Sequence, residues 1–344
     1  MKVRTIAVGA VLALVAATAL IVSAAGSASR AQDTFLAGVV SDVGRFNDKG
    51  FNQLSLKGCK SGARKAQGTC RALESRSTGD YLPNFARLQR DGADISIATG
   101  FLLAEGLATV AKRFPDGKFT IVDYSIKAPP LANAKGKPLF KNIVGLTFAT
   151  NENAYMIGCL AGLMAKRDGG NIISAVGGIK LPTVDIFIAA YRAGARKCAP
   201  GTRTLIDYSQ DFVDQAKCKE LALNQISEGS QVVFQVAGGC GLGALDAASE
   251  RNVAGIGVDA DQGHLGDHII SSALKRVDTA VYTAAQEVQD GSFQGGADTV
   301  FDLKSEGVGL GELNADAQKY SDQLQEVQQQ IIDGEIADIP TEVR

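Results

Sequence analysis

Short apolar runs alternate with longer amphipathic segments along most of this chain. The apolar runs are brief, mostly rich in β-branched residues and close to Gly, Asp or Asn, which is typical of buried strands. They are Phe35–Val40, Ile95–Ala98, Phe119–Val122, Ile143–Thr147, Ile172–Val176, Thr204–Asp207, Gln231–Val236 and Gly255–Val258. Segments with helical spacing are Leu102–Arg113, Ala154–Lys166, Phe187–Arg196, Lys217–Glu228 and a polar helix at Ala315–Ile332. This alternation predicts βαβ units, parallel sheets and therefore an α/β fold.

Polar residues and glycines follow several of the predicted strands. They include Asp42, Gly100, Asp123, Tyr124, Gly238, Gly239, Cys240 and Asp259. Any one of them is explained as well by a turn or a helix cap. Parallel sheets bind ligands beyond the carboxyl ends of their strands, so the recurrence at nearly every strand end favours a ligand site there.

The first residues differ from the rest of the chain. Met1–Arg4 carries two positive charges, and Thr5–Ala25 carries none and is almost entirely apolar. Small residues follow, with Ser29-Arg30-Ala31 ahead of Gln32. This pattern predicts a secretory signal over residues 1–31. The alternative is a membrane anchor, because about 20 apolar residues can just span a bilayer. Either way we expect an exported protein, in the periplasm or on the outer face of the cell membrane.

Composition narrows the class of protein. With 344 residues the chain is too long for one ordinary core and suits two lobes. The 35 basic and 37 acidic residues give a net charge of -2, which argues against a nucleic-acid partner.

The six cysteines all follow the signal, which favours disulfides in an exported protein. Sequence alone leaves many connectivities open. We favour the local pairs Cys59–Cys70 and Cys198–Cys218, which leave Cys159–Cys240. No C-x-x-C occurs, and both histidines lie far from any cysteine in sequence, so we expect no metal.

Catalytic and cofactor motifs are weak. The glycine-rich run Ala237–Gly243 follows a strand, but its glycines do not have the G-x-G-x-x-G order of a dinucleotide loop. It is better explained as a turn whose amides face a neutral ligand. The chain contains neither a P-loop nor the G-x-S-x-G of a hydrolase, so we expect no enzyme activity and no cofactor.

An ordered set of motifs resembles one known family. Asp42–Asn52, reading DVGRFNDKGFN, is similar to the first-strand signature of the basic membrane proteins, solute-binding proteins of ABC transporters that include purine nucleoside receptors. Further matching stretches follow in order over nearly all the mature chain. They include Gly100–Ala104, Phe114–Asp116, Ile121–Asp123, Gly145–Phe148, Val176–Ile179, Phe234–Gly239, Gly257–Gln262, Lys275–Asp278 and Gly307–Leu310.

The resemblance implies a type I periplasmic-binding-protein fold, with two Rossmann-like lobes, parallel sheets and a three-stranded hinge. One lobe would contain residues 35–148 and 266–299, the other residues 149–265 and 300–344. A small molecule, here a purine nucleoside, would close the lobes on each other, and an ABC transporter permease would receive it. We expect a monomer.

The resemblance also implies site residues. Phe51 and Phe187 would sandwich the base, and Asp123 would meet its polar edge. The remaining expected contacts are Asp42, Asn47 and Asn52 on the first lobe, and Gly239, Asp259 and Lys275 at the ribose. Two departures bear on specificity: Cys240 stands where the family carries a hydroxyl residue, and Gly50 stands where Ser is usual.

Three other functional classes are alternatives to a transport protein. An extracytoplasmic nucleoside hydrolase would need an acidic cluster near its N-terminus, which Phe35–Asp48 lacks. A repressor with the same lobes would carry a helix-turn-helix where the signal segment lies. A ligand-sensing receptor ectodomain remains an alternative, because the same binding domain would serve it.

Overall fold

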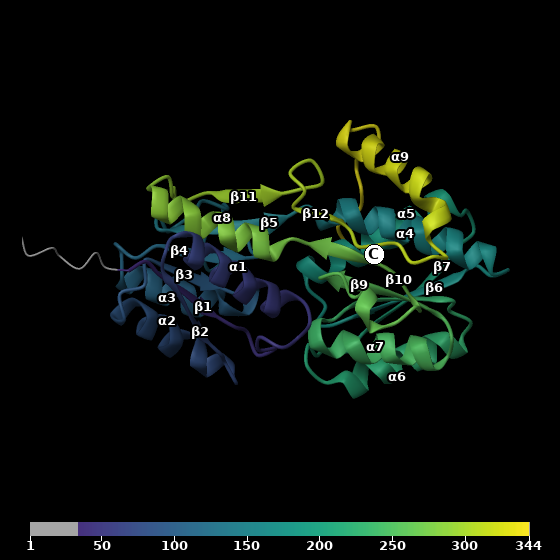
Figure 1. The fold of residues 1–344 in the computed structure, drawn as a ribbon, viewed down its shortest axis with the longest axis horizontal. Helices are drawn as coiled ribbons and strands as arrows, with labels where there is room; N and C mark the ends of the chain where they lie inside the picture. Colours follow the sequence, from purple (N-terminus) through teal and green to yellow (C-terminus); the bar gives the residue numbers. More distant parts are fainter. Residues whose placement is uncertain (1–33, 344) are drawn as a thin grey trace, which may run out of the picture. The chain divides into compact units, whose positions relative to one another are not determined.

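The computed structural model describes residues 34–343, and the predicted signal segment lies outside them. Two six-stranded sheets form the centres of two lobes (Figure 1). The first sheet has the order β11-β5-β4-β3-β1-β2, and all its pairs are parallel. Its strands are β1 (Leu36–Val40), β2 (Thr69–Leu73), β3 (Ile95–Ala98), β4 (Phe119–Val122), β5 (Ile143–Phe148) and β11 (Asp298–Phe301).

The second sheet has the order β12-β10-β9-β8-β6-β7 and is parallel except for β12, which runs antiparallel to β10. Its strands are β6 (Ile172–Gly177), β7 (Arg203–Tyr208), β8 (Val232–Val236), β9 (Ala254–Asp259), β10 (Ile269–Lys275) and β12 (Val308–Leu310). The central strands β3, β4 and β8 are buried throughout, as expected for strands covered on both faces.

Helices cover the sheets in packed pairs. In the first lobe α1 packs against α8 and α2 against α3; in the second, α4 packs against α5 and α6 against α7, while α9 lies on α4 (Figure 1). The helices are α1 (Phe51–Lys65), α2 (Tyr81–Arg90), α3 (Ala104–Arg113), α4 (Thr150–Arg167), α5 (Pro182–Cys198), α6 (Gln215–Ser227), α7 (Gly238–Glu250), α8 (Val277–Asp290) and α9 (Ser321–Ile332). The α/β prediction is confirmed.

The chain crosses between the lobes at β5–α4, at β10–α8 and between β11 and β12. Phe148 and Phe301 stack at these crossings, with ring centroids 5.3 Å apart. The sequence assigns residues 266–299 to the first lobe, but β10 within this range pairs with β9 and β12 in the second sheet. Only α8 and β11 return to the first lobe, so we propose that the boundary lies at the β10–α8 junction.

All six cysteines form disulfides. The predicted Cys59–Cys70 bond is confirmed, but the other two pairings are wrong: the structure has Cys159–Cys198 and Cys218–Cys240. Close helix packing is the reason. Glycines on α4, α5 and α7 let each helix approach the backbone of its partner, which brings the cysteines of α4 and α5, and those of α6 and α7, together.

Within residues 34–343 no helix combines the length and the apolarity needed to cross a membrane. The same residues contain no group of three or more His, Cys, Asp or Glu side chains placed to hold a metal ion.

Candidate ligand-binding site

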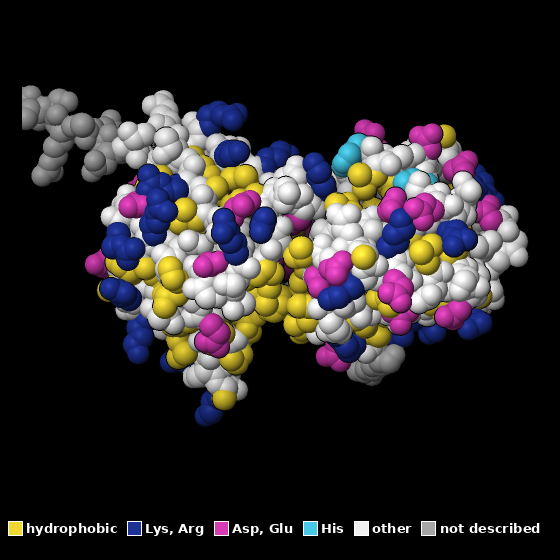
Figure 2. Space-filling model, turned by 90° about the horizontal axis from the view of Figure 1, so that it is seen from below, with side chains coloured by type: hydrophobic (Ala, Val, Ile, Leu, Met, Phe, Trp, Pro, Cys, Tyr) yellow, Lys and Arg dark blue, Asp and Glu magenta, His cyan; other side chains and the backbone are white. Residues whose placement is uncertain are grey.

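A cavity lies between the lobes at the carboxyl ends of both sheets. It encloses about 650 Å³, open solvent at its mouth included, and residues from both lobes line it. Figure 2 shows hydrophobic side chains on both lobes where the two meet.

On the first lobe, the loop between β1 and α1 is held by its own side chains. The Asp48 carboxylate accepts hydrogen bonds from the backbone N–H groups of Gly50, Asn52 and Gln53, and so fixes the start of α1. Asn52 is 2% exposed, and its Nδ2 donates to both Asp42 and Asp48 at 2.7 and 3.0 Å. These bonds leave Phe51 and Asp42 in fixed positions at the cavity.

Only one oxygen of the Asp42 carboxyl group accepts hydrogen bonds from the described residues. Its Oδ1 accepts from Gly44 N and Asn52 Nδ2, both at 2.7 Å. Burial raises the pKa of Asp42 to about 6, although the bonds from Gly44 and Asn52 oppose the shift. Asp42 therefore changes charge close to neutral pH.

Lys275, at the end of β10, joins the two lobes electrostatically. Its Nζ lies 2.7 Å from Asp123 Oδ2 on the first lobe and 3.5 Å from Asp259 Oδ1 on the second. Lys275 is 3% exposed, and its Nζ also lies 4.8 Å from the Phe187 ring centroid and 5.3 Å from that of Phe51. Burial alone would lower the pKa of Lys275, but the two carboxylates outweigh it and raise the pKa.

Asp259 is the most unusual residue of the cavity. It is the last residue of β9 and has a φ of 63°, in the left-handed region that non-glycine residues seldom occupy. Its Oδ1 is buried and has no hydrogen-bond partner among the described residues, although Lys275 Nζ lies within ion-pair distance. Burial raises the pKa of Asp259 to about 6 against the opposing effect of Lys275. Beyond the Lys275 ammonium group at 3.5 Å, Oδ1 meets no donor among the described residues, so it can accept a further hydrogen bond.

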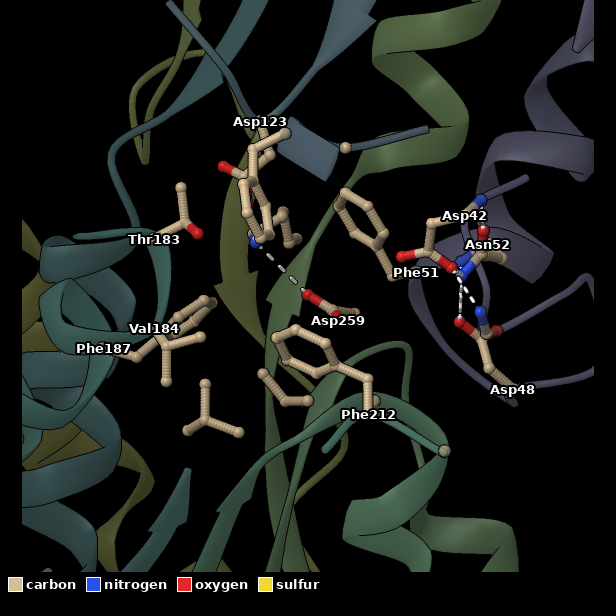
Figure 3. Close-up of a pocket in the computed structure, with 18 residues that line it drawn as sticks. Asp42, Asp48, Phe51, Asn52, Asp123, Thr183, Val184, Phe187, Phe212 and Asp259 are labelled. Carbon is tan, nitrogen blue, oxygen red and sulfur yellow. Dashed lines mark hydrogen bonds and ion pairs between the residues drawn. The ribbon is translucent and has the colours of Figure 1, made fainter. Parts of the chain in front are cut away.

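Four phenylalanines line the cavity, Phe51, Phe101, Phe187 and Phe212, and they differ in accessibility. Phe187 is 1% exposed and packs edge-on against Phe234, with centroids 6.3 Å apart. Phe212, in the loop between β7 and α6, is only partly buried. The rings of Phe51 and Phe212 both extend into the cavity, one from each lobe (Figure 3). Phe212 therefore offers a ligand more of its ring than Phe187 does.

Most of the residues expected from the sequence come together here. The cavity wall contains Asp42, Phe51, Asn52, Asp123, Phe187, Gly239, Asp259 and Lys275. Asn47 is exposed and is not among the described lining residues, whereas its neighbour Asp48 is buried in the wall. Ligand contact by any of these residues remains a prediction.

Sequence reasoning missed Asp48, Thr183, Val184 and Phe212, all of which line the cavity. Phe212 could have been predicted from its place after a strand, because it lies four residues after β7 ends at Tyr208. Thr183 and Val184 begin α5, beside the expected Phe187.

Comparisons with known proteins agree on one family. The model of the family Bmp, described as "ABC transporter substrate-binding protein PnrA-like", matches residues 35–340. The "ABC transporter nucleoside-binding protein BmpA" of Lactococcus lactis subsp. cremoris is 34% identical over 98% of this chain and 99% of its own length. An uncharacterised lipoprotein of Pyrococcus abyssi is 30% identical over 80% of this chain and 69% of its own length.

Among solved structures, a solute-binding protein of an ABC transporter system from Aeropyrum pernix K1 superimposes with a TM-score of 0.78. It is 25% identical in sequence, and the match covers 89% of this chain and 94% of the other. The two-lobed fold described above is therefore that of type I periplasmic-binding proteins.

Proposed function

Because the chain belongs to the Bmp family of PnrA-like ABC transporter substrate-binding proteins, we propose that it binds a purine nucleoside between its lobes and delivers it to a transporter permease. The family consists of binding proteins rather than enzymes. Membership in this family and the similarity to the Pyrococcus abyssi lipoprotein are consistent with a location outside the cytoplasm. We propose the periplasm or the outer face of the membrane.

The observation that carries the nucleoside proposal is the pairing of two accessible aromatic rings with a buried, unsatisfied carboxylate oxygen. A purine presents two flat faces, and stacking on an aromatic side chain contributes roughly 1–3 kcal/mol per base. We propose Phe51 and Phe212 as the two stacking faces. Phe187, which is 1% exposed, then serves as a wall behind them, in place of the stacking role expected from the sequence.

The ribose fits the Asp259 side of the cavity. Asp259 Oδ1 needs a donor, and a ribose hydroxyl supplies one. Hydrogen bonds to a carboxylate are shorter and stronger than neutral ones. Lys275 keeps the charge of Asp259 balanced within the buried site, and it can donate to a sugar oxygen at the same time. Gly239, which has no side chain, allows close approach of the sugar to the start of α7.

The base edge fits Asp42. Asp123 Oδ2 already accepts from Lys275 at 2.7 Å, so its main role in our proposal is to hold that ammonium group. Asp42 keeps an oxygen for the ligand, and an ionised carboxylate only accepts hydrogen bonds. The bound base therefore needs N–H donors on its polar edge, which purines such as guanine and hypoxanthine carry.

The charge of the cavity favours a nucleoside over a nucleotide. Four carboxyl groups line it, those of Asp42, Asp48, Asp123 and Asp259, against the single ammonium group of Lys275. A phosphate group placed here would meet like charges in a largely buried site, which is strongly unfavourable.

Contacts across the cavity support closure as the signal to the permease. Lys275 pairs with carboxylates of both lobes, and Gln262 Nε2 of the second lobe donates to the backbone oxygen of Lys49 in the first. A ligand that touches both lobes stabilises the closed state over the open one. The permease can then distinguish the ligand-bound protein from the empty protein by the closed arrangement of the lobes.

Mass spectrometry of small molecules released from natively purified protein tests the proposal. We expect a purine nucleoside in the denatured supernatant, and its absence after the protein has been stripped by unfolding and refolding. Stoichiometric release of a sugar, an amino acid or another solute class would exclude the nucleoside.

A further inference from the structure

The start of α7 is a part of the cavity wall that its own sequence stabilises poorly. Gly238, Gly239, Gly241 and Gly243 all fall in its first turns, and glycine is among the worst helix formers. Among the described residues no side chain caps this helix, and its first turn carries no acidic residue. Gly238 and Gly239 nevertheless line the cavity, so their position matters to a ligand.

Packing explains why better helix formers do not occupy this turn. A Cβ added at Gly241 would collide with the Gln235 side chain, and one added at Gly243 would collide with the backbone oxygen of Gln215, which begins α6. The close approach of α7 to α6 and to β8 therefore requires these glycines. Rigidity at this position has to come from another residue.

Cys240 is that residue. Its Sγ is bonded to Cys218 of α6, and both cysteines are fully buried. Its backbone N–H donates to the Phe212 oxygen at 3.0 Å, and its Sγ lies 3.5 Å from Ser209 Oγ in the same loop. A single residue thus connects the glycine turn, α6 and the loop that presents the Phe212 ring.

We propose that the Cys218–Cys240 disulfide is a positioning element of the ligand site, so that tight binding requires the oxidised chain. Without the bond, α7 loses its covalent link to α6, and the glycine turn is held against the 209–214 loop, which leads directly into α6, only by noncovalent contacts such as the Cys240 N–H to Phe212 O bond. The ligand then has to order both when it binds, which lowers affinity. As far as the ligand is concerned, this inference rests on the proposed nucleoside function.

The chain supplies its own matched control. Cys159–Cys198 also joins two packed helices of the second lobe, but at a distance from the cavity in sequence. Cys240 directly follows the lining residue Gly239, whereas α4 contributes no lining residue and Cys198 ends α5 at the opposite end from the lining residues Thr183, Val184 and Phe187. Its cysteines are 39 residues apart in sequence, against 22 for Cys218–Cys240. In the chain-entropy account, removing the bond that closes the longer loop destabilises the protein at least as much. Stability and affinity can therefore be separated.

The experiment compares the double variants C218A/C240A and C159A/C198A with the native protein. Inosine affinity is measured by calorimetric titration, the melting temperature by thermal unfolding, and amide hydrogen exchange is followed without ligand. We expect C218A/C240A to bind inosine at least tenfold more weakly and to exchange faster in residues 209–214 and 238–241. C159A/C198A should bind within twofold of the native protein despite an equal or larger fall in melting temperature.

Two results would overturn the inference: inosine binding by C218A/C240A within twofold of native, or affinity losses in both variants that follow their melting temperatures. If C218A/C240A does not fold, C218A alone, which keeps the Cys240 side chain, takes its place. If the native protein binds no nucleoside, the proposed function fails. The exchange measurement still tests the disulfide, because unchanged protection of both segments would refute its positioning role.

Discussion

Phe212→Ala should mainly lower the affinity for the ligand, whereas Phe187→Ala should mainly lower the stability of the protein. Phe212 is partly buried in a loop, so Phe212→Ala removes a stacking face and little packing. The loss of one stack, roughly 1–3 kcal/mol, weakens nucleoside binding by about 5–150-fold. The free energy of unfolding of the unliganded protein should hardly change.

Phe187→Ala should behave in the opposite way. Its ring is 1% exposed and packs against Phe234, so truncation leaves a cavity in the second lobe. Such substitutions typically cost about 3–5 kcal/mol of stability. Affinity should fall less than in Phe212→Ala once the titration is done well below the melting temperature, because Phe187 offers the ligand little surface.

Calorimetric titration with inosine and with hypoxanthine, together with thermal unfolding, measures both effects. Val213→Ala is the control for the loop, since the Val213 side chain is 53% exposed beside Phe212. Phe212→Ala should weaken nucleoside and free base alike, while Val213→Ala leaves both nearly unchanged. Two results together would contradict this assignment: native-like ligand affinity in Phe212→Ala, and a large loss of affinity in Phe187→Ala at temperatures where that variant is folded. Phe187 would then be the residue that stacks on the base.

The other predictions concern charge in the cavity. Asparagine tolerates the left-handed backbone at position 259, so Asp259→Asn should fold. It should weaken the binding free energy of a nucleoside by roughly 1.5–3 kcal/mol and leave that of the free base nearly unchanged. Equal losses of nucleoside and base affinity in calorimetric titration would contradict the ribose role. Inosine 5′-monophosphate should bind at least tenfold more weakly than inosine in the same assay, because of the excess of carboxyl groups. Burial raises the pKa of Asp42 and of Asp259 to about 6, so each contributes stability to the unliganded protein that is lost as pH rises through about 6. Binding has the opposite sign, since the ligand needs the ionised forms: affinity measured at pH 5 should be about tenfold lower per carboxyl than at pH 7.5, and a flat profile would exclude both groups as acceptors.

Much of the fold was predictable because strands and helices leave a local pattern. The apolar runs at Ile95–Ala98 and Phe119–Val122 coincide with β3 and β4 residue for residue. Strands β2, β11 and β12 are more polar or more exposed, and β10 carries two serines among its apolar residues; none of the four was expected. The division of the lobes near β10 depends on hydrogen bonds to β9 and β12, which no local signal reveals.

Site residues that directly follow strands could be predicted from the sequence. Those in the turn after β1 could not, because the local hydrogen bonds decide which residue faces the cavity. Asn47 and Asp48 are adjacent, but Asp48 turns inward because its carboxylate accepts from three N–H groups at the start of α1. The disulfides show the same limit. Cys198 bonds to Cys159 because of the close contact of α4 and α5, which is a property of the packed structure and not of sequence distance.

The central claim is that the cavity takes a purine nucleoside, and calorimetric titration of ligand-stripped protein with a panel of solutes tests it most directly. The panel contains inosine, guanosine, adenosine, their free bases, ribose and a neutral hexose. We predict one site per chain that binds at least one purine nucleoside far more tightly than its base or ribose alone, because stacking and the Asp259 contact act together. Tight binding of the hexose with no heat from any nucleoside would contradict the account.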